Sequence, residues 1–157
     1  VNDVVPKFME KGVYEPVPSK ATISNAMDVG DPSNFIRIQH LYQGNLETLR
    51  ENLSSYSFSD EETREAMKKI HAQSGYVMDP HGAVGYLGLK EYQKHYSDTY
   101  GIFLETAHPV KFLDVVEDTL GLTPEIPPQI QKVMGREKKS HLIKTYEDLK
   151  AFLLATA

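Results

Sequence analysis

Apolar residues recur along this chain with the spacing of short amphipathic helices. After Asn34, the residues Phe35, Ile38, Leu41 and Tyr42 follow the i, i+3, i+6/i+7 rhythm of one helix face. The same kind of pattern, with glycines as end signals, predicts further helices over residues 4–10, around 46–53, from 60 to about 74, from 80 past 92, from 109 to 120, and after Thr145. The chain is therefore expected to be mainly helical.

Two of these helices carry clear start signals. Ser59 is followed three residues later by Glu62, which is the spacing of a capping box. Asp79 stands before Pro80, which places an acid at the cap position and a proline in the first turn. We expect one helix to begin after Ser59 and another at Pro80.

Glycines recur every three residues in the helix that Pro80 opens. Gly82, Gly85 and Gly88 each lower helix propensity by about 1 kcal/mol relative to alanine. A row of them on one helix face indicates that another backbone or a ligand approaches closely.

A short apolar run over residues 100–105 has the length of a buried strand in a parallel sheet. It is followed by Thr106, His108 and Pro109, and then by a helix. Residues 140–144 are a second possible strand. The pattern predicts the α/β class: a helix-rich three-layer segment with a short parallel sheet.

Composition narrows the class of protein. The chain has 157 residues, with 17 Lys and Arg against 22 Asp and Glu, a net charge of −5. This suits a single domain over residues 1–157, and the mild acidity argues against binding to nucleic acid or to a membrane surface. No apolar run approaches the ~20 residues of a membrane helix. The chain has no cysteine, and its histidines lack metal-site spacing, so we expect a cytoplasmic protein without a metal.

Three places are candidates for binding chemistry, each with a purely structural alternative. Thr106 and His108 follow the predicted strand, where α/β proteins bind ligands, but either side chain could instead cap the next helix. Asp79 and His81 could likewise be a cap and a solvated imidazole. The polar loop of residues 24–34 either holds a substrate or forms only turns.

Four segments together resemble one enzyme family. Residues 2–6, 21–29, 79–86 and 106–112 are similar, in order and over essentially the whole chain, to the C-terminal part of threonine synthase. The resemblance implies the fold of the fold-type II, tryptophan synthase beta-like enzymes. It also implies pyridoxal 5'-phosphate as cofactor and the conversion of O-phospho-L-homoserine and water into L-threonine and phosphate.

The resemblance assigns roles to individual residues. It implies that the Thr106 hydroxyl contacts the pyridine nitrogen of the cofactor and that Asp79 lies beside the cofactor. It makes Ser24, Asn25 and Asp28 the candidates for substrate contact.

One part of the family pattern is absent from this sequence. The Schiff-base lysine of the family stands in a Phe-Lys-Asp context far upstream, and this tripeptide does not occur here. We therefore expect no catalytic residue in this chain. It should be the C-terminal portion of a longer enzyme, inactive without its N-terminal part and able to self-associate through an uncovered sheet edge.

Two other functions remain open at this point. One is a different fold-type II lyase, such as a threonine or serine dehydratase, although the His-Pro pair after Thr106 and the sequence from Asn25 to Asp28 favour threonine synthase. The other is a non-catalytic α/β interaction module that never binds pyridoxal phosphate.

Overall fold

The computed structural model describes residues 2–156, and of Thr156 only the backbone. Contacts divide this chain into two compact units, one ending at Glu125 and the other beginning at Ile126. No helix in the described part is long and apolar enough to cross a membrane.

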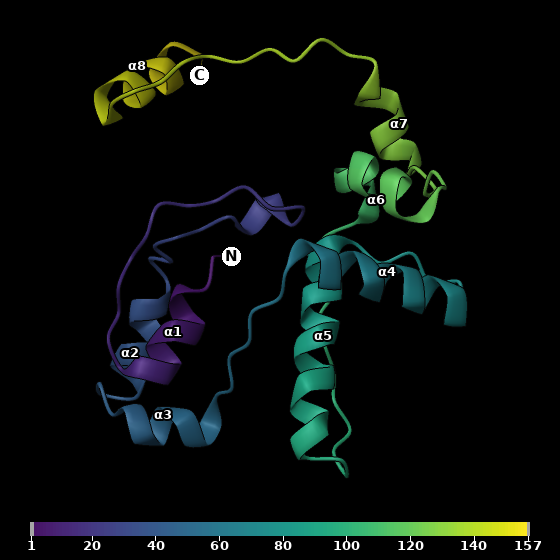
Figure 1. Cartoon of the computed structure of the whole chain (residues 1–157). Coiled ribbons are helices and arrows are strands. Elements are labelled where there is room, and N and C mark those ends of the chain that lie inside the picture. The colour runs from purple at the N-terminus through teal and green to yellow at the C-terminus, as the bar shows by residue number, and fades with distance from the viewer. Residues whose placement is uncertain (1, 157) are drawn as a thin grey trace. The chain divides into compact units, whose positions relative to one another are not determined.

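The helices predicted from the apolar spacing are all present (Figure 1). Those of the first unit are α1 Val4–Lys11, α2 Phe35–Leu41, α3 Leu46–Asn52, α4 Asp60–Ser74, α5 Pro80–His95 and α6 Leu113–Leu120, with single 3₁₀ turns at Asn25–Met27 and Pro109–Phe112. The second unit holds α7 Pro128–Met134 and α8 Tyr146–Thr156. The sequence pattern did not predict α7, because Pro127 and Pro128 look like helix breakers. They occupy the cap and first helical positions, where proline is tolerated.

The start of α4 is the capping box that its sequence predicts. The backbone N–H of Glu62 donates to Ser59 Oγ at 3.2 Å, and the backbone N–H of Ser59 donates to Glu62 Oε2 at 2.8 Å. The helix ends at Gly75, which has a left-handed φ of 71°. Both boundaries of α4 are therefore set by local chemistry.

Replacing Ser59 with alanine should lower the free energy of unfolding by about 1 kcal/mol, since it leaves a helix N–H without its acceptor. Chemical denaturation should show an earlier midpoint with an unchanged slope. Ser54→Ala is the matched control, because Ser54 is exposed and its hydroxyl makes no hydrogen bond within residues 2–156. Equal midpoints for the two variants would contradict the role given to the capping box.

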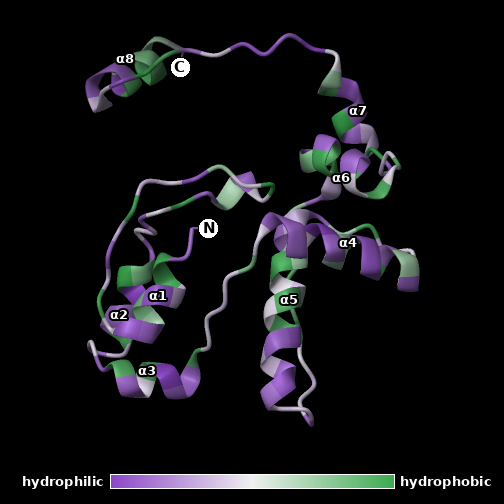
Figure 2. Cartoon of the chain, viewed as in Figure 1, coloured by the Kyte–Doolittle hydropathy of each residue, from purple (hydrophilic) through white to green (hydrophobic). Residues whose placement is uncertain are grey.

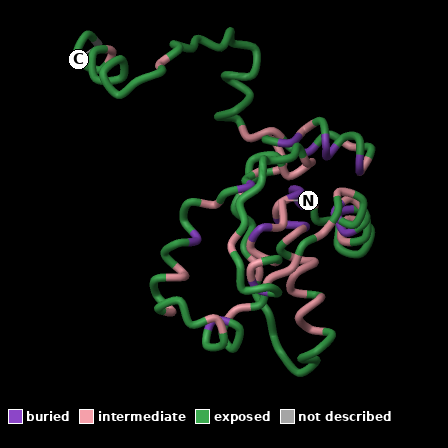
Figure 3. Tube along the Cα trace, turned by 60° about the vertical axis from the view of Figure 1, so that its left-hand side comes forward, coloured by how far each residue is buried: buried purple, intermediate pink, exposed green. Residues whose placement is uncertain are grey.

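The main core lies between α4, α5 and α6. Met67, Met78, Ala83 and Val116 are its most deeply buried members. Figure 2 shows that the N-terminal half of α5 is largely hydrophobic while α4 is mostly polar, as expected for a helix that buries only one face. In Figure 3 the buried positions gather in the first unit, and the second unit is almost entirely exposed.

Aromatic rings form a smaller core near α1 and α2. The rings of Phe8 and Phe35 meet edge to face at 5.3 Å, and Tyr14 stacks on Phe35 at 5.9 Å. Such ring pairs add about 0.5–1.5 kcal/mol beyond the area they bury. This cluster holds the extended segment after α1 against α2.

The predicted parallel sheet is not formed within residues 2–156. Residues 100–105 are extended but not buried, since Ile102 is 92% and Leu104 75% exposed. Residues 140–144 are not a strand either. The physical reason is the absence of a partner: no second extended segment in the described chain supplies the ladder of hydrogen bonds that a strand needs. The expectation of a buried strand is therefore wrong for this chain, while the helix-rich character is confirmed.

The segment of residues 100–106 instead runs back along α5 (Figure 1). Glu105 lies against Gly82, and a Cβ built on Gly85 would be 3.8 Å from Cβ of Phe103. The close approach predicted from the glycine spacing is confirmed at Gly82, where the approaching group is the Glu105 side chain. At Gly85 and Gly88 a Cβ would have only ordinary contacts, at 3.8 and 3.9 Å.

Candidate functional site

The first turn of α5 contains a completely buried acid. Asp79 is 0% exposed, and its Oδ1 accepts the backbone N–H of His81 at 2.9 Å. The same oxygen lies 2.9 Å from Nδ1 of the His81 ring. Asp79 thus caps the helix as its position before Pro80 predicts. Its second oxygen, Oδ2, receives no N–H or hydroxyl donor from residues 2–156.

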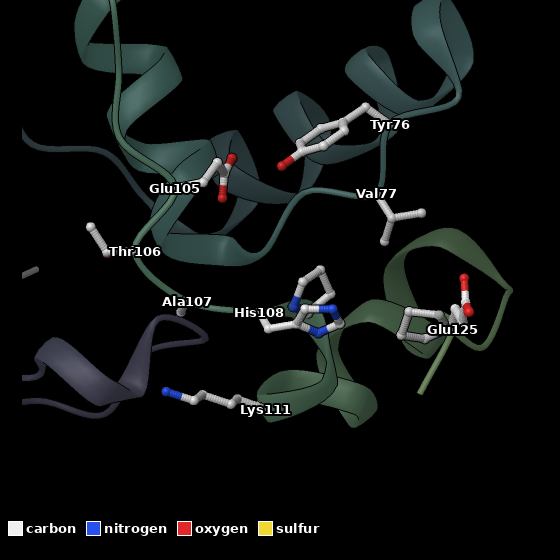
Figure 4. Close-up of a pocket in the computed structure, with 10 residues that line it drawn as sticks. Tyr76, Val77, Glu105, Thr106, Ala107, His108, Lys111 and Glu125 are labelled. Carbon is white, nitrogen blue, oxygen red and sulfur yellow. The ribbon is translucent and has the colours of Figure 1, made fainter. Parts of the chain in front are cut away.

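Glu105 reaches Asp79 from the extended segment. Although Glu105 as a residue is exposed, its carboxyl end lies against Gly82 and in hydrogen-bond contact with Asp79. Partial burial, and then the contact with and charge of Asp79, raise the pKa of Glu105 to about 7. Burial and the same two acids also raise the pKa of Tyr76, whose hydroxyl points toward the Glu105 carboxyl in Figure 4.

An open pocket of about 600 Å³ is lined by Glu105, whereas Asp79 is not part of its wall. Thr106 lies in its wall, is exposed, and makes no hydrogen bond through its hydroxyl within the described residues. His108 is different, because its Nδ1 accepts the backbone N–H of Val110 at 3.1 Å and so caps the 3₁₀ turn that follows. Of the two alternatives for this region, capping applies to His108 and leaves the Thr106 hydroxyl free for a ligand.

The loop that contains Ser24, Asn25 and Asp28 borders a second pocket of about 260 Å³. Ser24 and Asp28 line it together with His81, whereas Asn25 is not part of its wall. His81 also contacts Asp79. The structure therefore brings Ser24, Asp28 and Asp79 together around His81 at the start of α5. Thr106 lines the other pocket.

Asp28 already has its hydrogen bonds within the loop. It accepts from the Thr22 hydroxyl at 2.6 Å, from the Thr22 backbone N–H at 2.9 Å and from Nδ2 of Asn2 at 3.1 Å. A carboxylate with three donors is well satisfied and holds the loop in shape. The Ser24 hydroxyl lies 3.1 Å from that of Thr22 and stays beside the pocket.

Sequence reasoning missed two ionisable groups of this candidate site. Glu105 was only the last residue of a predicted strand, and Tyr76 only a residue between two helices. The row of glycines in α5 was the available signal, since it indicated a close neighbour at Gly82 without identifying the neighbour as a carboxyl group.

Comparisons with a family model, with curated proteins and with solved structures lead to the same description, threonine synthase. The family model described as "Threonine synthase, C-terminal" matches residues 82–153. A threonine synthase of Escherichia coli (strain K12) is 39% identical over 141 residues, which are 90% of this chain and 32% of the relative. The crystal structure of the threonine synthase from Escherichia coli matches with a TM-score of 0.85 and 35% identity, over 100% of this chain and 36% of that chain.

A pyridoxal-phosphate-bound threonine synthase from Brucella melitensis shares the fold, with a TM-score of 0.69 at 23% identity over 97% of this chain and 38% of that one. The chain spans about a third of the length of the curated relatives that it matches.

Proposed function

The chain belongs to the threonine synthase family as its C-terminal segment, and on that premise we propose that it completes the pyridoxal-phosphate site of such an enzyme. The proposed reaction converts O-phospho-L-homoserine and water into L-threonine and phosphate. The observation that carries the proposal is the free Thr106 hydroxyl in the wall of the 600 Å³ pocket.

The direction of Thr106 follows from the extended backbone before it. Successive side chains of an extended segment point to opposite sides. Phe103 and Glu105 lie on α5, at Gly85 and Gly82, so Thr106 faces the side away from that helix.

The cofactor supplies an electron sink for the reaction. The uncharged hydroxyl of Thr106 would donate one hydrogen bond to the pyridine nitrogen of the cofactor, which suits an unprotonated nitrogen. Asp79 is fully buried at the start of α5 and would lie beside the cofactor without touching the open pocket, behind the residues that line it.

The same exposed side of the segment is the proposed contact with the rest of the enzyme. Ile102 and Leu104 are 92% and 75% exposed. They precede Thr106 by four and two residues, so all three side chains lie on the same side of the extended segment. Large apolar side chains in an unpaired extended segment call for a cover. The relatives are about three times as long as this chain, so their remaining two thirds are the proposed cover and the source of the anchoring lysine. Without that cover, this side is where the chain would self-associate.

The loop of Ser24, Asn25 and Asp28 is proposed to contact the substrate. Ser24 is the group at the pocket, and Asp28 acts through its hydrogen bonds to Thr22 and Asn2, which fix the loop. Asn25 lies in the 3₁₀ turn beside Ser24 but outside the pocket wall, so it is the least directly placed of the three candidates.

A chimera tests the proposal. We expect this chain, put in place of the C-terminal segment of the Escherichia coli threonine synthase, to give a protein that binds pyridoxal phosphate and releases phosphate from O-phosphohomoserine. The 157-residue chain alone should release none, since covalent catalysis needs the anchoring amine. A folded chimera that does not bind the cofactor would support an interaction module. A chimera that binds it but acts only on serine or threonine would support a dehydratase.

A further inference from the structure

When two carboxyl groups are in contact and at least partly buried, the second one ionises only at a higher pH than usual. The charge of the first acid raises the pKa of the other, which therefore keeps its proton longer. Asp79 and Glu105 are in this position, and the proton would supply the donor that Asp79 Oδ2 otherwise lacks.

The surroundings decide which acid holds the proton. Asp79 Oδ1 accepts the backbone N–H of His81 and lies 2.9 Å from the His81 ring nitrogen, so this carboxyl already has partners at the start of α5. Glu105 has no N–H donor within residues 2–156, and burial with the charge of Asp79 raises its pKa to about 7. The proton therefore belongs to Glu105.

We infer that Glu105 is a positioning residue, whose protonated carboxyl donates to Asp79 Oδ2 and so holds the end of the extended segment, with Thr106, against the start of α5. Gly82 makes the contact possible, because the Glu105 carboxyl occupies the space of a Cβ at that position. The consequence for the cofactor rests on the proposed role of Thr106, whereas the contact itself does not.

Other ionisable groups face the same place. Tyr76 approaches from the segment before α5, and His81 from its first turn. His108, Lys111 and Glu125 line the pocket on the remaining side. The raised pKa of Glu105 comes from burial and from the contact with and charge of Asp79, and none of the three basic groups lowers it. The sign follows: the contact is present below pH 7 and is lost as the pH rises through about 7, when Glu105 ionises beside Asp79.

Titration of the 157-residue chain tests this inference. With ¹³C-labelled glutamate carboxyl groups, one resonance should titrate near pH 7 and be absent in Glu105→Gln. Glu125→Gln is the matched control, since Glu125 is an exposed acid of the same pocket, and it should leave that resonance unchanged. A Glu105 midpoint below pH 5 would overturn the inference.

Backbone ¹⁵N order parameters over residues 103–106 test the positioning. In the wild type they should fall from about 0.8 at pH 6 to below about 0.6 at pH 8, as the segment is released. Glu105→Gln should keep the high values at both pH values, because an amide N–H replaces the acid proton, and Glu105→Ala should show the low values at both. Order parameters in Glu105→Ala equal to those of the wild type at pH 6 would show that the contact positions nothing.

A glycine pair checks the geometry without changing an ionisable group. A methyl group at Gly82 meets the Glu105 carboxyl, so Gly82→Ala should behave like Glu105→Ala. Gly85→Ala should behave like the wild type, because a Cβ there has ordinary contacts of 3.8 Å with Phe103. Order parameters in Gly82→Ala that equal those of the wild type at pH 6 would contradict the inferred contact.

The consequence for the cofactor is measured in a complete threonine synthase that carries this segment. In the wild type, the dissociation constant for pyridoxal phosphate should rise severalfold from pH 6 to pH 8. In Glu105→Gln the rise should be smaller. If Glu105 titrates near 7 but the two proteins show the same pH dependence, the contact is real and the proposed role of Thr106 fails.

Discussion

Replacing Thr106 with valine should lower kcat about ten- to a hundredfold in a complete threonine synthase that carries this segment. Valine keeps the shape of the side chain and removes only the hydroxyl. A buried ring nitrogen without its partner costs about 1–3 kcal/mol, which corresponds to this loss when it falls on the transition state. The melting temperature should change little, because valine fills the same volume and the Thr106 hydroxyl makes no hydrogen bond within residues 2–156 that would be lost.

Thr106→Ser is the matched control, since it keeps the hydroxyl and removes a methyl group. It should retain most of the activity. The competing explanation is that Thr106 serves only the turn before the 3₁₀ helix, where it would act on stability. That explanation predicts a lower melting temperature and an unchanged kcat per folded molecule for Thr106→Val. The cap of that turn is already His108, whose Nδ1 accepts the Val110 N–H.

What the sequence predicted well is local. The start of α4 at Ser59 and Glu62, the start of α5 at Asp79 and the end of α4 at Gly75 each depend on residues within a few positions of the boundary. Capping side chains and left-handed glycines act through their own helix turn, so one sequence is enough to identify them. The same locality explains why Asp79 was found as a candidate.

What the sequence could not show depends on distant partners. Residues 100–105 have the composition of a strand, but a strand also needs a neighbour, and the described chain provides α5 in that place. Glu105 acquires its raised pKa only because it meets Asp79, which is far from it in sequence. The hydrophobic pattern carries no signal for interactions of this kind. The glycines of α5 indicated a close neighbour but did not identify it.

Asp79 should be among the residues whose loss most destabilises the first unit. Asp79→Ala removes the cap of α5, worth about 1 kcal/mol, and leaves the His81 ring and the Glu105 carboxyl without their partner, at about 1–3 kcal/mol more. We expect a loss of about 2–4 kcal/mol in the free energy of unfolding, measured by denaturant titration at pH 6. Asp98→Ala is the control, an exposed acid in a turn, and should change it by less than about 0.5 kcal/mol.

Asp79→Asn separates the cap from the charge. The asparagine oxygen can still accept the His81 N–H, so most of the cap energy should remain. Its amide N–H can donate to an ionised Glu105, so burial still raises the pKa of Glu105 but the contact with and charge of Asp79 no longer do. In the wild type the raised pKa makes stability decline as the pH rises from about 5 to about 7, and in Asp79→Asn this decline should be smaller. A decline of the same size in both proteins would mean that Asp79 does not raise the pKa of Glu105.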